Sequence, residues 1–136
     1  MPLVLVWPDP GQPDSPMRSW LADVTDGVIV AAWDPSGEDS GRTALLTSVR
    51  DAREALTARG VDPNELVLVG VGLGGVAAAG LARHAKRLGI GLARVLAVAG
   101  TWDEPDPFSG APLREVPERV ELVPESYLLA TTLRRT

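Results

Sequence analysis

The sequence of 136 residues contains no cysteine and only one histidine, His84. Without cysteine there is neither a disulfide framework nor thiolate chemistry, and a single histidine excludes a histidine-rich metal site. Aromatic residues are also few, with one Tyr, one Phe and four Trp. The chain therefore lacks the residues that most metal and thiol enzymes use, and we predict no metal and no cofactor.

Positive charge is in short supply as well, since 13 Lys and Arg stand against 18 Asp and Glu, a net charge of −5. Phosphate backbones and anionic lipid surfaces repel such a protein, so we predict neither nucleic acid nor a membrane as a partner. No apolar run approaches the roughly 20 residues that cross a bilayer. The start, Met-Pro-Leu-Val-Leu-Val, lacks the features of a secretory signal. We expect a cytoplasmic protein.

What is present is the composition of an ordinary globular protein, with 45% hydrophobic and 23% charged residues. A chain of this length can bury one core but not two sizeable ones. We therefore predict one α/β domain over residues 1–136.

Short apolar runs ended by turns alternate with helical patterns along the chain. Strands are predicted at residues 3–7, 27–33, 65–69, 94–99 and 119–123. Helices are predicted at residues 17–24, with Ser15 and Pro16 opening it, at 43–59, from the glycine turn at 70–75 to 88, and at 126–135. Strands that are apolar throughout indicate a parallel, doubly wound sheet with helices on both faces, and ligands bind such sheets beyond the carboxyl ends of the strands.

The segment from Gly60 to Ala77 reads GVDPNELVLVGVGLGGVA, a helix end and strand followed by a glycine turn that opens an Ala-rich helix. It resembles the carboxylesterase/phospholipase branch of the α/β hydrolases, which includes acyl-protein thioesterases and has the pattern Gly-Phe-Ser-Gln-Gly-Gly-Ala. A looser match runs from Leu3 to about Pro107, with Ala99-Gly100 where the family has Ser-Gly. The resemblance implies a shortened hydrolase core whose five parallel strands have the flavodoxin-like order 2-1-3-4-5.

In this resemblance Gly72 takes the place of the nucleophilic serine, and glycine has no side chain with which to attack a carbonyl. The amide of Leu73 stands where the family has half of its oxyanion hole. The family's acid and histidine follow later strands, whereas His84 lies within the helix after the turn. We therefore predict a non-hydrolytic, hydrolase-like domain that binds a small molecule or a protein partner at its strand ends.

Three alternatives stay open. Gly70, Gly72 and Gly75 also fit the Gly-x-Gly-x-x-Gly pattern of a nucleotide-binding turn, although that fingerprint normally opens the first βαβ unit and here opens the third. An enzyme of hydrolase descent, either a hydrolase or a carboxylate-based isomerase or cyclase, could use the oxyanion-like turn with a carboxylate such as Asp34 or Asp103. A partner subunit or homo-oligomer could dock through a truncated sheet edge or the terminal helix.

Tryptophan and aspartate follow three of the predicted strands. The pairs are Trp7 with Asp9, Trp33 with Asp34, and Trp102 with Asp103. In the hydrolase strand order they would ring Gly72 and line a pocket for a cationic or flat aromatic ligand, and the three carboxylates could also hold a hard cation. The structural interpretation is that the indoles fill the core and the aspartates form turns. Trp20 is predicted to pack under a helix elsewhere in the core.

Overall fold

The computed structural model describes residues 1–11 and 17–135, and its centre is a sheet of five parallel strands in the order β2-β1-β3-β4-β5. The strands are β1 (Leu3–Trp7), β2 (Gly27–Val30), β3 (Val67–Val71), β4 (Arg94–Val98) and β5 (Val120–Val123). Parallel strands need crossover connections, and the helices between them supply these. The predicted fold class and strand order are confirmed.

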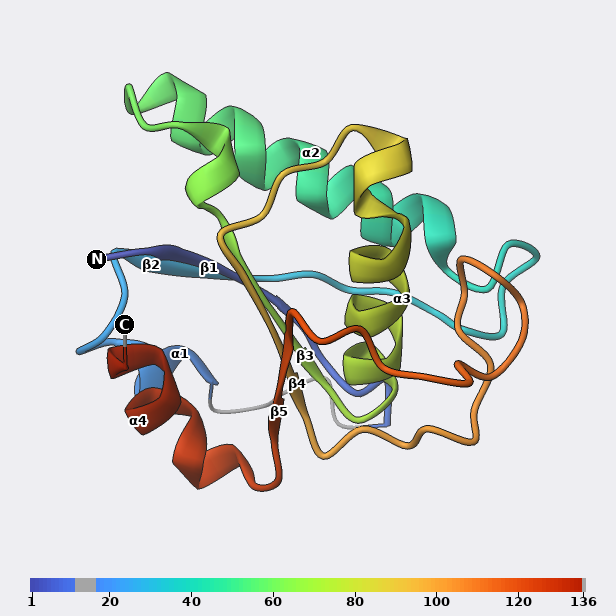
Figure 1. Cartoon of the computed structure of the whole chain (residues 1–136). Helices are drawn as coiled ribbons and strands as arrows, with labels where there is room; N and C mark the ends of the chain where they lie inside the picture. The colour runs from blue at the N-terminus through green and yellow to red at the C-terminus, as the bar shows by residue number, and fades with distance from the viewer. Residues whose placement is uncertain (12–16, 136) are drawn as a thin grey trace.

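Helices cover both faces of the sheet (Figure 1). The helices are α1 (Met17–Leu21), α2 (Arg42–Ala58), α3 (Leu73–Leu88) and α4 (Leu129–Arg134), with single 3-10 turns η1 (Pro63–Glu65) and η2 (Ser126–Leu128). α2 and α3 pack on one face, and α1 and α4 pack on the other. Two apolar cores therefore lie back to back, separated by the sheet.

The strand β1 shows how the sequence dictates this arrangement. Leu3, Leu5 and Trp7 belong to the core beneath α2 and α3, whereas Val4 and Val6 belong to the core beneath α1 and α4. Both sets are buried, so the strand reads as a continuous apolar run rather than an alternation. This explains why periodicity alone does not reveal which residues face which helix.

Several predicted boundaries were wrong by a few residues. β2 ends at Val30, so Trp33 lies in the loop before α2. β3 begins at Val67 because Asp62 accepts a hydrogen bond from the amide of Asn64 and closes the turn η1 ahead of it. The first helix stops at Leu21, and its proposed start at residues 15–16 lies outside the described residues.

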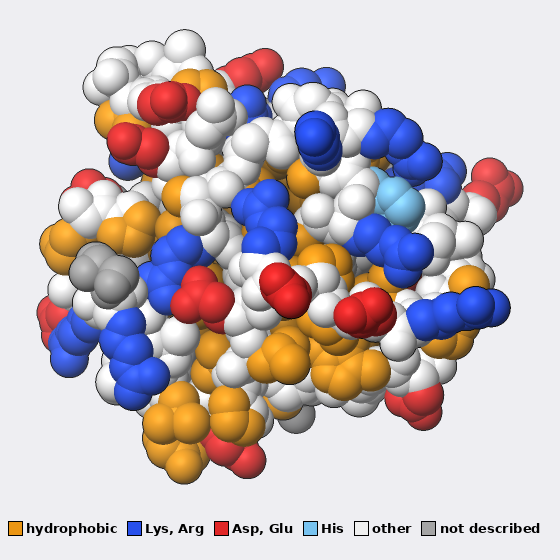
Figure 2. All heavy atoms as spheres, viewed as in Figure 1, with side chains coloured by type: hydrophobic (Ala, Val, Ile, Leu, Met, Phe, Trp, Pro, Cys, Tyr) orange, Lys and Arg blue, Asp and Glu red, His pale blue; other side chains and the backbone are white. Residues whose placement is uncertain are grey.

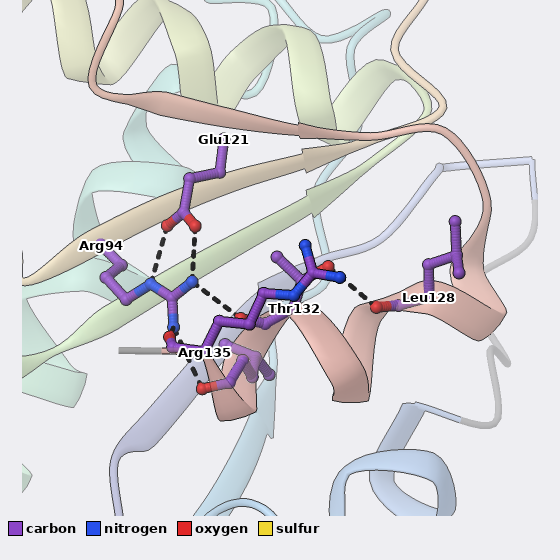
Figure 3. A network of polar contacts seen from close by, with 6 residues as sticks. Arg94, Glu121, Leu128, Thr132 and Arg135 are labelled. Atoms are coloured by element: carbon purple, nitrogen blue, oxygen red, sulfur yellow. Dashed lines mark hydrogen bonds and ion pairs between the residues drawn. The ribbon is translucent and has the colours of Figure 1, made fainter.

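The end of the chain is held to the sheet by Arg94 at the start of β4 (Figure 3). Its Nε donates to Glu121 Oε2 on β5 at 2.7 Å, and its remaining nitrogens donate to Glu121 Oε1 and to the carbonyls of Thr132, Leu133 and Arg135. The hydrogen bonds to Glu121 raise the pKa of Arg94. One guanidinium thus anchors the carbonyl end of α4, where the helix dipole favours a cation.

β5 lies at an edge of the sheet and pairs with one strand only among the described residues. Leu122 on this strand is 59% exposed, and Tyr127 in η2 is 77% exposed. Hydrophobic side chains also gather on the side of the molecule near β5 and η2 (Figure 2). Within the described residues, no helix has both the length and the apolar character needed to span a membrane.

Candidate functional site

The glycine turn between β3 and α3 has the backbone geometry of a sharp strand-to-helix bend. Gly72 has φ 58° and ψ −120°, a conformation that L side chains rarely adopt. Its amide donates to Val98 O at 2.9 Å, and its carbonyl accepts from the amides of Gly75 and Val76. The bend is therefore fixed to β4 on one side and to the first turn of α3 on the other.

Two neighbouring glycines are required by close packing. A Cβ on Gly70 would lie 2.0 Å from Gly74 O, and a Cβ on Gly74 would lie 2.0 Å from Trp7 O. The backbones of β1, β3 and α3 therefore approach more closely here than any side chain allows. Packing alone accounts for these two glycines, of which Gly70 belongs to the Gly-x-Gly-x-x-Gly pattern and Gly74 does not.

Asp9, in the loop after β1, lies directly against Gly72. A Cβ on Gly72 would be 2.5 Å from Asp9 Oδ2 and 2.9 Å from its carboxyl carbon. Asp9 Oδ1 accepts a hydrogen bond from the amide of Gly11 at 3.1 Å, which holds the carboxylate in its own turn. The carboxylate stands beside the N-terminus of α3, where a negative charge is favourable.

A cavity of about 300 Å³ opens at the same edge of the sheet. Its wall consists of Trp33, Pro35 and Ser40 from the loop between β2 and α2, Leu73 at the start of α3, and residues 104–107 and 110 from the loop after β4. Other hollows of the described surface, of about 70 to 470 Å³, are lined by residues away from the carboxyl ends of the strands. A cavity beyond the carboxyl ends of parallel strands is where this fold class binds ligands.

Of the three strand-end tryptophans, only Trp33 lies in the cavity wall. Its Nε1 donates to Pro8 O at 2.9 Å, and the ring lies so close to Gly41 that a Cβ there would be 2.8 Å from Cε3. The hydrogen bond and the contact with Gly41 fix the plane of the indole. Trp33 is half-buried, which suits a residue that forms part of a binding wall.

Trp7 and Trp102 do not line the cavity. Trp7 is fully buried, its Nε1 donates to Ser48 Oγ at 2.9 Å, and its ring stacks on Phe108 with centroids 6.2 Å apart. Trp102 is half-buried over Gly100, where a Cβ would be 2.6 Å from the indole. Trp7 thus fills the core beneath the site, as the structural interpretation of these residues predicts.

Leu73 lies in the cavity wall as predicted, whereas Asp34 and Asp103 are not among the residues that line it. Asp34 is exposed and accepts from the amide and hydroxyl of Ser36 at 2.9 and 2.6 Å, bonds that lower its pKa. Asp103 is exposed. Within the described residues no three His, Cys, Asp or Glu side chains gather as a metal site would require, so Asp9, Asp34 and Asp103 do not form one. The burial predicted for Trp20 was wrong, because it is 48% exposed.

Asp106 is a member of the cavity wall that sequence reasoning missed. It is fully buried, and its two carboxyl oxygens accept from the amides of Phe108 and Ser109 at 3.0 and 3.2 Å. Its Oδ1 would lie 1.8 Å from a Cβ on Gly80, in the middle of α3. The signal was Gly80, a glycine in the middle of an Ala-rich helix, which indicates close approach of another chain segment.

Strained backbone also concentrates at this edge of the sheet. Ser40 and Ala99 are the non-glycine residues with positive φ in the described part of the chain, at 59° and 50°. Ser40 lies in the cavity wall, and Ala99 follows β4 directly. Asp39 supports the strained turn by accepting from the amides of Gly41 and Thr43, and the bonds with Thr43 lower its pKa. Such strain is found more often at functional sites than elsewhere.

His84 lies on α3, twelve residues after Gly72, which is roughly 18 Å along a helix axis. It is half-buried, and its Nε2 has no hydrogen-bond partner within the described residues. At that separation the imidazole cannot take a proton from a group at the glycine turn. The structure therefore places no histidine base at this turn.

No family model matches the sequence, and no curated protein matches it. Among solved structures, an acetyl ester-xyloside bifunctional hydrolase from Caldicellulosiruptor lactoaceticus is similar over 98% of this chain and 54% of its own, with a TM-score of 0.58 and 17% identity. RedJ, solved with a PEG molecule bound in its active site, is similar over 75% of this chain and 44% of its own, with a TM-score of 0.46 and 16% identity. The chain spans about half the length of these proteins. The first of these likenesses shows that this chain shares its α/β fold with part of that hydrolase.

Proposed function

We propose that this protein is a non-hydrolytic, hydrolase-like domain that binds a small molecule in the cavity at the carboxyl ends of its strands. The observation that carries the proposal is the contact between Asp9 and Gly72. The strand-to-helix bend has no side chain to act as a nucleophile, and a carboxylate from the neighbouring loop occupies the space such a side chain would need. The bend shapes one side of a binding site without supplying a reacting group.

Ester hydrolysis by a serine mechanism requires a hydroxyl at the bend, a base within hydrogen-bond reach and donors for the developing oxyanion. Position 72 provides no hydroxyl, and His84 is too far along α3 to be the base. Asp9 places negative charge at the start of α3, where an oxyanion would have to be stabilised. None of the three requirements of a serine mechanism is met at this bend, which supports a non-hydrolytic function.

The enzymatic alternative is a reaction that needs only a carboxylate acid or base. Asp106 suits that role poorly because backbone amides hold both of its oxygens. Glu104, which is exposed in the cavity wall, is the carboxylate best placed for it. A nucleotide is disfavoured because its phosphates would meet Asp9 at the glycine turn.

Two measurements test the proposal together. The protein should not be labelled by a fluorophosphonate probe and should not hydrolyse short p-nitrophenyl esters, whereas a metabolite panel should contain ligands that quench or shift tryptophan fluorescence. The matched control is Trp33→Phe, which removes the indole of the cavity wall and should abolish most of the signal. Stoichiometric labelling of a serine, or ligand signals that persist unchanged in Trp33→Phe, would contradict the proposal.

A protein partner is the second candidate, favoured by the outer side of β5, which pairs with no strand within residues 1–11 and 17–135. A strand from a second copy could add to this edge next to Leu122, whose side chain is 59% exposed. Sedimentation velocity over a range of concentrations tests it, with Leu122→Asp as the disrupting variant and Leu88→Asp, on an exposed site at the end of α3, as the control. A protein that is monomeric throughout the range would exclude the second copy.

A further inference from the structure

We infer that the ligand of the strand-end cavity is a small organic cation, an ammonium ion with an apolar body. The inference rests on the proposed function and names the chemical class of its ligand. Two features carry it: the negative charge of the surrounding loops, which includes the buried Asp106 and the exposed Glu104, and the aromatic and apolar parts of the wall.

The loops around the cavity carry negative charge and no positive charge. Residues 8–11 contain one carboxylate, Asp9, and residues 31–41 contain three, Asp34, Glu38 and Asp39. Residues 99–113 contain three more, Asp103, Glu104 and Asp106, which makes seven in all without Lys, Arg or His. The nearest basic residues in sequence, Arg42 and Arg114, are exposed. The potential at this edge therefore attracts cations and repels anions.

Asp106 contributes a buried negative charge to the cavity wall. Its side chain is fully buried, yet none of the ion pairs within residues 1–11 and 17–135 involves it. Two backbone amides satisfy its oxygens but bring no full positive charge. Buried carboxylates are ordinarily paired with a cation because burial removes their hydration. The charge of Asp106 therefore adds to the negative potential of the wall, and Glu104 is the exposed carboxylate of the wall that a bound cation would approach.

The rest of the wall suits the body of an organic ammonium ion better than a metal ion. Trp33 presents an indole whose plane is fixed by Pro8 O and Gly41, and indole is the aromatic ring that binds cations best. Pro35, Pro105 and Leu73 add apolar surface. The site that would favour an anion, the N-terminus of α3, already has Asp9 beside it. Carboxylate, phosphate and carbonyl ligands are therefore disfavoured.

The experiment compares choline with its neutral isostere 3,3-dimethylbutan-1-ol and with the anion 3,3-dimethylbutanoate, by calorimetry on the whole chain. We expect choline to bind about tenfold tighter than the alcohol, the anion to bind weakest, and higher salt to weaken choline alone. Trp33→Leu should weaken choline by about two- to thirtyfold, with part of the loss recovered in Trp33→Phe. Glu104→Gln should weaken choline more than Glu118→Gln, a matched change outside the cavity wall.

Equal affinity for choline and the alcohol, or tighter binding of the anion, would overturn the cation inference and leave cavity binding intact. No binding of any of the three at millimolar concentration would also overturn it. The proposed function is judged separately by the fluorophosphonate probe and the metabolite panel, so the two can fail independently. Thermal melting of each variant shows whether it is folded before its affinity is compared.

Discussion

Asp9 Oδ2 lies 2.5 Å from the point where a Cβ on Gly72 would stand, so the carboxylate of one loop fills the side-chain position of the neighbouring bend. The two residues come from loops after adjacent strands, β1 and β3, which are paired in register with Trp7 opposite Gly70. Their contact ties the absence of a side chain at position 72 to a negative charge at the start of α3. Position 72 and position 9 should therefore respond to mutation as a unit.

The first prediction concerns Gly72→Ser, which should fail to create esterase activity and should destabilise the protein. The new residue must adopt φ 58°, a strain of about 1 to 3 kcal/mol, and must displace the Asp9 carboxylate. Urea denaturation and fluorophosphonate labelling are the measurements.

Gly60→Ser is the matched control, because Gly60 also has a positive φ, 74°, but a Cβ there meets nothing within 4 Å. We expect the loss at Gly72 to exceed the loss at Gly60, and Asp9→Ala to recover part of the difference. Equal losses at the two glycines would mean that Asp9 moves aside freely.

A second prediction reverses a general rule. Gly→Ala inside a helix ordinarily stabilises by about 0.5 to 1 kcal/mol, but Gly80→Ala should destabilise, because its Cβ would lie 1.8 Å from Asp106 Oδ1. Thermal melting measures the sign. In an Asp106→Ala background the same change should cost less, and a stabilising Gly80→Ala in the native background would show that the loop over α3 is not seated as described.

The sequence predicted the sheet well because each strand is an apolar run that the sheet buries on both faces, and because turns mark every strand end. The site was predicted only in part. Trp33 and Leu73 reach the cavity, but Trp7 is the last residue of β1 and shares the α2 and α3 face with Leu5, so its indole enters the core instead. The position of a residue after a strand predicts at which edge of the sheet it lies. The direction of its side chain depends on where the strand ends, which the sequence predicted only to within a few residues.

Asp106 shows the other limit of the sequence. Its loop has no repeating pattern, and its burial depends on a contact with Gly80 that lies 26 residues away along the chain. A non-local contact of this kind has no periodic signature. In the sequence, this contact is indicated by Gly80, the glycine in the middle of α3.

A third prediction concerns pH. Asp39 accepts hydrogen bonds from the amides of Gly41 and Thr43, and its folded pKa is lowered from 3.8. A lowered carboxyl pKa contributes stability above the unfolded value that is lost as pH falls through the folded value. The difference in unfolding free energy between the native protein and Asp39→Asn should therefore be largest near neutral pH and shrink below 3.8. Glu38→Gln, which removes one negative charge from the same loop, is the control variant. A pH-independent difference would contradict the assignment.

A fourth prediction concerns the end of the chain. Arg94→Met keeps the aliphatic stem but removes every donor to Glu121 and to the last carbonyls of α4. We expect α4 to exchange its amide hydrogens faster, with a smaller change in α2 and α3. Hydrogen exchange by mass spectrometry measures this, with Arg50→Met as the control because Arg50 is exposed on α2 and pairs only with its neighbour Asp51 within the described residues. Unchanged protection of α4 would show that apolar packing by Leu129 and Leu133 suffices.

The last prediction separates the tryptophans by role. Trp7 is fully buried and hydrogen-bonded to Ser48, so Trp7→Ala should cost about 3 to 5 kcal/mol of a total stability of about 5 to 15 kcal/mol. Trp33→Ala should lower the stability less, because the indole is half-buried and its Nε1 donates to a loop carbonyl, Pro8 O. Trp20→Ala, at an exposed position, should change stability by about 0.5 kcal/mol or less.

Ligand binding should follow a different order, since Trp33 alone of the three lies in the cavity wall. Thermal melting of the three variants gives their order of stability, and calorimetry gives their order of ligand affinity. If the proposed site is correct, Trp33→Ala should weaken ligand binding the most of the three variants while lowering stability less than Trp7→Ala does. Trp20→Ala should keep both the affinity and the stability of the native protein. If Trp33→Ala instead melts as early as Trp7→Ala and no ligand distinguishes it from the native protein, then Trp33 fills space in the core as Trp7 does, and the cavity is a packing defect rather than a binding site.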